Sequence, residues 1–158
     1  SRRSRVQVVG ADRSTKKLLE EALRIRDLNT FDYKWLIFDK DDNDDFNEAI
    51  LYAEKAGFQC AWSNESFELW FCLHFIDLRT SVSRRQYIDI LEREIRRYVP
   101  EFIYTKGGDV MYDILRKYGS QEKAVSRAQN LRLNYSGNDY ASQNPCTTVD
   151  ILVEKLKR

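Results

Sequence analysis

The chain has few of the residues that interrupt or cross-link a fold. Its 158 residues include two prolines and six glycines, so no stretch has the composition of a flexible linker. The three cysteines, Cys60, Cys72 and Cys146, cannot all pair with one another and lack the spacing of metal ligands, which favours reduced thiols. We therefore expect a single domain over residues 1–158, large enough to bury one core.

Long hydrophobic runs are also missing. No apolar segment approaches the roughly 18 residues of a membrane span, and no signal peptide is visible at the start. The formal net charge is +1 although 32% of residues are charged, which excludes a strongly basic nucleic-acid binder on composition but leaves room for a local basic patch. We expect a soluble, cytoplasmic protein without a membrane partner.

The most informative stretch lies at positions 35–45. Four apolar residues lead directly into Asp39, and four more aspartates follow by position 45, which predicts a buried strand that ends in a cluster of negative charge. Ligands bind at the carboxyl ends of strands in open α/β sheets, and Mg²⁺ takes oxygen ligands from one or two carboxylates. Because side chains alternate along an extended chain, Asp39 and Asp41 are expected on one side, as candidate metal ligands.

The same acidic residues have a simpler interpretation. Asp44 or Asp45 can cap the helix that follows, and carboxylates are favoured near a helix start. Asp42 is a secondary candidate for the site. Lys40 can neutralise charge on a bound phosphate, or be an ordinary solvated lysine between two ligands.

Apolar periodicity predicts alternating strands and helices in the first half of the chain. The expected elements are a strand at Arg5–Val9, a helix through Leu18–Ile25, a strand at Tyr33–Asp39, a helix at Phe46–Ala56 ended by Gly57, and a strand at Phe58–Trp62. This order calls for right-handed crossovers and a mainly parallel sheet flanked by helices, with strand ends near Gly10, Asp39 and Ser63 along one edge. The second half is expected to be helical, with a polar loop at positions 134–147.

A second informative stretch covers positions 63–75. Ser63 or Asn64 is expected to cap a helix that is apolar on nearly all sides, which makes Glu68 conspicuous. Glu68 can be neutral, favour the helix dipole, meet an arginine, or face the Asp39 cluster through a metal. His74 is the only histidine, and is either a hydrogen-bonded core residue or a functional ligand or base.

Basic and aromatic residues of the second half suggest a nucleic-acid surface. Eight of them can line a phosphate-binding surface beside the acidic site or form solvated helix faces: Arg84, Arg85, Lys106, Arg116, Lys117, Lys123, Arg127 and Arg132. Arg84 and Arg85 are expected just ahead of a helix. Tyr135 and Tyr140, in the polar loop, are placed where bases can stack on them.

Several motifs together resemble the RloB-like family of bacterial abortive-infection proteins, from about Val8 to the C-terminus. The motifs that carry the resemblance are Phe38–Asp42, Phe46–Ile50, Ser63–Asn64, Phe67–Trp70, Leu73–Phe75, Asn144–Pro145 and Thr147–Val149. That family is similar to the Toprim superfamily of nucleases, topoisomerases and primases. The resemblance implies a Toprim-like α/β core, a role in defence against phage, and metal-dependent attack on a nucleic-acid phosphodiester, in RNA or DNA.

The resemblance also assigns roles to individual residues. The Toprim Asp-x-Asp pair that binds Mg²⁺ falls on Asp39 and Asp41, and the shared motifs include Asn64, Glu68 and His74. A glutamate at the end of an earlier strand usually completes the site, but here Gly10-Ala11-Asp12 follows the first expected strand. The resemblance therefore implies that a native first strand and helix precede residue 1.

These observations predict Mg²⁺- or Mn²⁺-assisted phosphodiester hydrolysis. Asp39 and Asp41 hold the ion, and Glu68 is a further ligand or orients the attacking water. A rival hypothesis from another class is a non-catalytic regulatory subunit, whose acidic edge binds a metal or a basic surface and controls a companion ATPase.

Overall fold

The structure is a computed structural model, and it describes residues 15–157. The predicted strand at Arg5–Val9 and the expected strand end near Gly10 lie outside these residues. Within them the elements are α1 (Thr15–Leu23), η1 (Leu28–Thr30), β1 (Trp35–Asp39), α2 (Phe46–Lys55), β2 (Gln59–Asn64), α3 (Glu68–Leu73), α4 (Arg84–Ile95), α5 (Val110–Tyr118), α6 (Gln121–Arg132), η2 (Tyr140–Ser142), β3 (Cys146–Thr147) and α7 (Val149–Leu156). No helix of this part of the chain is long and apolar enough to span a membrane.

A small mixed sheet organises the first half. β1 and β2 pair in parallel, with Asp39 opposite Ser63, and α2 forms the crossover between them. The predicted parallel pair is confirmed. The strand β3 was not predicted. It pairs antiparallel with the end of β2, so the sheet within residues 15–157 is mixed and has the order β1-β2-β3.

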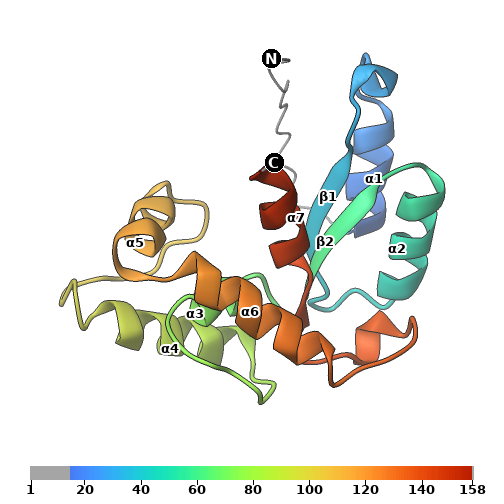
Figure 1. Cartoon of the computed structure of the whole chain (residues 1–158). Helices are drawn as coiled ribbons and strands as arrows, with labels where there is room; N and C mark the ends of the chain where they lie inside the picture. The colour runs from blue at the N-terminus through green and yellow to red at the C-terminus, as the bar shows by residue number, and fades with distance from the viewer. Residues whose placement is uncertain (1–14, 158) are drawn as a thin grey trace.

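Helices cover both faces of this sheet. Figure 1 shows β1 and β2 between α7 on one side and α1 and α2 on the other. Leu36 and Phe38 of β1 face the α1–α2 side and join its core, whereas Ile37, on the opposite face, is 49% exposed. The predicted burial of β1 therefore holds for its α1–α2 face, whereas Ile37 on the other face is exposed.

The second half packs as a helical unit around α3. α3 lies against both α4 and α6 (Figure 1). Leu69, Leu73, Leu91 and Ala128 are fully buried there. The described residues thus contain two apolar clusters, one under the sheet and one among the helices. The junction between the clusters is where the polar site forms.

The end of β2 departs from the sequence prediction. Ser63 and Asn64 do not cap α3, because both lie in β2, and three further residues precede the helix. The Asn64 amide donates to the carbonyl oxygens of Ala141 and Gln143, each at 3.0 Å, and the Ser63 hydroxyl lies 2.8 Å from that of Thr147. These buried bonds hold β3 and the preceding loop against β2, so Asn64 has a structural role here.

A buried ion pair fixes the last helix against α6. Asp150 of α7 is 1% exposed, and its Oδ2 accepts a hydrogen bond of 2.6 Å from Arg132. The same guanidinium donates to the carbonyl oxygen of Thr147 at 2.7 Å. This arginine therefore connects α6, β3 and α7, and removing its partner leaves a charge without compensation.

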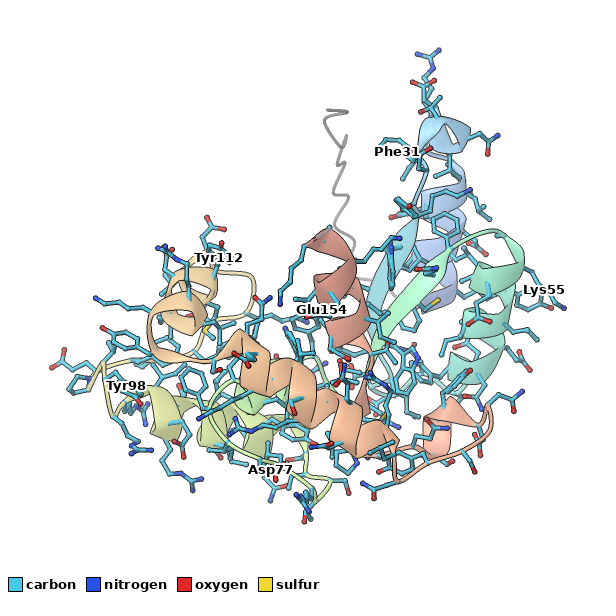
Figure 2. All side chains as sticks on the ribbon, viewed as in Figure 1. Phe31, Lys55, Asp77, Tyr98, Tyr112 and Glu154 are labelled. Carbon is cyan, nitrogen blue, oxygen red and sulfur yellow. The ribbon has the colours of Figure 1, made fainter. Side chains whose placement is uncertain are left out.

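We expect Asp150→Ala to lower the free energy of unfolding by about 3 kcal/mol, because Arg132 stays in place without its carboxylate. Glu154→Ala is the matched control on the same helix, since Glu154 pairs with Lys157 at the surface (Figure 2) and should change stability by less than about 1 kcal/mol. Urea denaturation of both variants measures the difference. Equal effects would show that the buried pair contributes no more than an exposed one.

Candidate functional site

The candidate site lies where the turn after β1 meets the start of α3. The amide of Lys40 donates to the carbonyl oxygen of Ser63 at 2.9 Å, and that of Asp41 to Glu65 at 3.0 Å. These bonds hold the acidic turn against the segment that leads into α3, whose first residue is Glu68. Asp39, Asp41 and Glu68 are thereby brought to one place, around Arg84.

Asp39 and Asp41 do not converge because side chains alternate along a strand, and that predicted reason was wrong. β1 ends at Asp39, and Asp41 has a φ of +44°, so the alternation of extended chain does not extend to it. Aspartate tolerates this left-handed conformation better than most residues. The conformation of the turn, and not the geometry of the strand, brings the Asp41 carboxylate to the same guanidinium as Asp39.

Arg84 lies at the centre of the three carboxylates. Its guanidinium donates to Asp39 Oδ2 at 2.6 Å and to Asp41 Oδ2 at 3.3 Å, and its Nε lies 3.7 Å from Glu68 Oε2. Burial alone lowers the pKa of Arg84, but the charges of the three carboxylates outweigh this effect and raise the pKa. The guanidinium therefore remains charged and partly neutralises the cluster.

Arg84 is an unusual residue for its place in a helix. It follows Ser83, which forms a capping box with Gln86, and so begins α4. Cations are disfavoured near a helix N-terminus because of the helix dipole. The carboxylates of the site supply the compensation. Arg85 lies in the same first turn, so the sequence signal is a pair of cations at a helix start, and it does not choose between the two.

Glu68 is the most buried member of the cluster, at 3% exposure. Its Oε1 accepts a hydrogen bond of 3.1 Å from the hydroxyl of Tyr104, whereas its Oε2 accepts none from residues 15–157. Of the four interpretations open for Glu68, the structure places it beside an arginine and also facing Asp39. Tyr104 was not predicted for the site, because nothing in the sequence near it marks a partner so distant in the chain.

The pKa of Asp39 is changed by the charged groups that surround it. Burial raises the pKa of Asp39 above its ordinary value, and the charge of Glu68 raises it further. A backbone hydrogen bond from Phe67 and the charge of Arg84 act in the opposite direction. The site thus holds carboxylates that a positive charge must stabilise, and Arg84 now provides that charge.

The other predicted site residues lie apart from this centre. Asp42 is exposed, and the Lys40 ammonium donates to the carbonyl oxygen of Asp41 at 3.2 Å. Neither lines the cleft that opens over the carboxylates, and nor does Asn64 or His74. This cleft has a volume of about 680 Å³, and its walls include Asp39, Asp41, Glu68 and Arg84.

Most of the predicted basic and aromatic surface is occupied in other ways. Of the eight basic residues, Arg84 and Lys106 line the cleft, whereas Arg127 donates to the carbonyl oxygen of Leu73. Tyr140 packs against Trp62 with ring centroids 5.3 Å apart. Tyr135 also packs against the cluster under the sheet, so the two tyrosines predicted for base stacking pack within the fold.

The capacity of the site for a metal follows from its donors. Among residues 15–157, no group of three or more His, Cys, Asp or Glu side chains has an arrangement that holds a metal ion. Asp39 and Asp41 do present carboxylate oxygens to the same guanidinium, and Mg²⁺ is commonly bound by one or two carboxylates and completed by water and phosphate oxygens. The residues fit a cation held in this open way, which would compete with the Arg84 guanidinium for the same two oxygens.

The fold and the site define an α/β protein with a cluster of acidic residues, bridged by an arginine, at the carboxyl end of its parallel strands. A family model described as RloB-like protein matches residues 1–156, and the chain belongs to that family. Comparisons with curated proteins and with solved structures found no match.

We expect Arg84→Gln to destabilise the metal-free protein by about 2 kcal/mol, between the values for exposed and buried ion pairs, because three carboxylates then face one another. Arg85→Gln is the control, since Arg85 pairs with Asp89 at the surface. Urea denaturation in EDTA measures both. An unchanged free energy of unfolding in Arg84→Gln would show that the guanidinium does not hold the cluster together.

His74 is a buried residue at the end of α3. Its Nδ1 lies 2.9 Å from the carbonyl oxygen of Trp70, which can only accept, so Nδ1 carries the proton. Burial lowers the pKa of His74 below its ordinary value of 6.5, and the charge of Arg127 lowers it further. This environment favours a neutral core histidine.

The lowered pKa makes stability depend on pH with a definite sign. As pH falls through 6.5, the unfolded chain binds a proton at His74 that the folded chain does not, so stability falls by up to about 1.4 kcal/mol per pH unit until the folded pKa is reached. His74→Asn, whose amide can replace the Nδ1 donor, should remove this slope. Urea denaturation between about pH 7.5 and pH 5.5 measures it, and identical slopes in the two proteins would contradict the assignment.

Proposed function

We propose that this protein is a metal-dependent nuclease that hydrolyses phosphodiester bonds of RNA or DNA in bacterial defence against phage. The observation that carries the proposal is the convergence of Asp39, Asp41 and Glu68 at the carboxyl end of β1, in a cleft open to a ligand. Membership of the RloB-like family and the parallel β1-β2 pair support a Toprim-like core.

Asp39 and Asp41 are the residues that would hold Mg²⁺ or Mn²⁺. When bound, the cation supplies charge stabilisation for a phosphoryl oxygen and a water acidic enough to attack at neutral pH. The remaining chemistry belongs to the chain. Glu68 Oε2 is buried, lies 3.7 Å from Arg84 Nε and accepts no hydrogen bond from the described residues, so this oxygen is the one that would accept a proton from the attacking water or orient it.

Arg84 has a second task in this proposal. A guanidinium recognises phosphate oxygens as well as carboxylates, and it remains charged in this site. Arg84 lines the same cleft as the acidic residues, so a phosphate there meets both a cation-binding pair and a positive side chain. The arginine offsets the repulsion between the carboxylates and a polyanionic substrate.

We expect Asp39→Asn in the full-length protein to reduce cleavage of tRNA and plasmid DNA by at least about 100-fold, because a ligand of the cation is lost. Asp42→Asn is the matched control, an exposed carboxylate of the same turn that does not line the cleft. Gel assays with Mg²⁺ or Mn²⁺, and with EDTA, measure the rates. Retained cleavage in Asp39→Asn would remove the proposed site.

A non-catalytic role has one observation in its favour. Arg84 and Tyr104 already bind the carboxylates, so the cluster is neutralised in part without any ligand. In that case the protein is a regulatory subunit, whose acidic site binds a metal or a basic surface and controls a companion ATPase. Calorimetry of Mn²⁺ binding by the wild type and Asp41→Ala, followed by the cleavage assays, separates the two functions, because binding without cleavage favours the regulatory role.

A further inference from the structure

The cleft over the acidic cluster is lined by two groups of residues with different chemistry. One group is Asp39, Asp41 and Glu68 with Arg84 between them, and the other is the loop that leads from Tyr104 to α5. This loop contributes Thr105, Lys106, Gly107 and Gly108 to the cleft. A polyanion that approaches the carboxylates needs positive charge nearby, and Lys106 brings such a charge to the same cleft.

The root of this loop is fixed to both halves of the site. The amide of Tyr104 donates to Glu92 of α4 at 2.8 Å, and its hydroxyl donates to Glu68 at 3.1 Å. The tyrosine ring also packs edge-on against Phe71, with centroids 6.3 Å apart. The loop therefore begins at a defined distance from the carboxylates, which suits a ligand-positioning element.

The two glycines of the loop differ in what the fold requires of them. Gly107 has a φ of +79°, a conformation that other residues rarely adopt. Gly108 does not have such a φ, and a Cβ there would meet only the carbonyl oxygen of Thr105, at an ordinary 3.6 Å. The fold would accept a side chain at Gly108, so its absence on a cleft wall points to the close approach of a ligand.

We infer that the Lys106-Gly107-Gly108 loop binds the phosphodiester backbone of a single nucleic-acid strand in the cleft that it shares with Asp39 and Asp41. The inference rests on the proposed function and deepens it by naming the wall that holds the substrate. Lys106 supplies the charge, and the bare backbone of Gly108 lets a phosphate come close to the chain.

The dimensions and lining of the cleft favour a single strand over a duplex. A volume of about 680 Å³ encloses a ligand of small-molecule size, which corresponds to about one or two nucleotides of extended strand. Phe67 and Phe71 also line the cleft and are only half-buried. Aromatic surface of this kind accepts an unstacked base, which a paired strand does not offer.

The role of the Lys106 charge is tested by measuring how a single strand binds at different salt concentrations. A labelled single-stranded oligoribonucleotide of about 15 nucleotides is bound to the full-length protein in EDTA, and fluorescence anisotropy follows the binding over a salt series. Lys106→Ala should remove one phosphate contact, so the slope of log K against log salt should fall in magnitude by about 0.7. Between 1 M and 0.1 M salt, the variant should therefore gain about fivefold less in affinity than the wild type. Lys106→Arg should keep the slope. Lys123→Ala, on the exposed face of α6 and away from the cleft, should also keep it.

The close approach is tested separately by Gly108→Ala in the same assay. Its methyl group should weaken binding severalfold at every salt concentration without changing the slope, because the obstacle is steric and not electrostatic. Its melting temperature should equal that of the wild type, since the added Cβ meets only an ordinary contact. A duplex of the same sequence should bind more weakly than the single strand.

The outcomes separate this inference from the proposed function. If Lys106→Ala and Gly108→Ala both bind like Lys123→Ala while the wild type binds and cleaves, the loop is not the substrate wall and the nuclease proposal stands. A duplex that binds as tightly as the single strand also overturns the inference. If the wild type binds no strand under any condition, the inference and the nuclease proposal both fail.

Discussion

The contact of Arg84 with Asp39, Asp41 and Glu68 is the constraint on which the site depends. Three carboxylates cannot share a half-buried place without a positive charge, because neither water nor the apolar surroundings compensate their repulsion. The guanidinium supplies that charge, and it comes from the first turn of α4, where the helix itself would favour an acidic residue. The interaction thus joins the strand end, the start of α3 and the start of α4.

The cleft exists because two apolar clusters meet there. Phe38 belongs to the cluster under the sheet, whereas Phe67, Phe71 and Met111 belong to or pack against the cluster among the helices, and all four line the cleft. Each cluster buries its own apolar side chains, and the polar groups of the site lie at the junction between the two clusters. A ligand in this place would contact residues of both clusters, and the site can respond to how they pack.

Patterns of short range were read correctly from the sequence, and contacts of long range were not. The strand that ends at Asp39, the helix after it and the crossover to a parallel strand were all predicted, because periodicity and a glycine in a left-handed turn are local signals. β3 was missed because it has two residues and takes its partner from 84 positions away. For the same reason Ser63 and Asn64 were misread as caps, since β3 extends the pairing of β2 through them.

The sequence by itself determined that carboxylates gather after an apolar strand and that Glu68 lies near the start of an apolar helix, because burial and strand or helix geometry depend on near neighbours. Only the tertiary structure decided which cation meets them. Arg84 is one of eight basic residues considered, and it lies 45 positions from Asp39, with no spacing rule that connects the two. The choice follows from the packing of α3 against α4, which fixes the distance between the guanidinium and the carboxylates, and packing of this kind is a property of the assembled core.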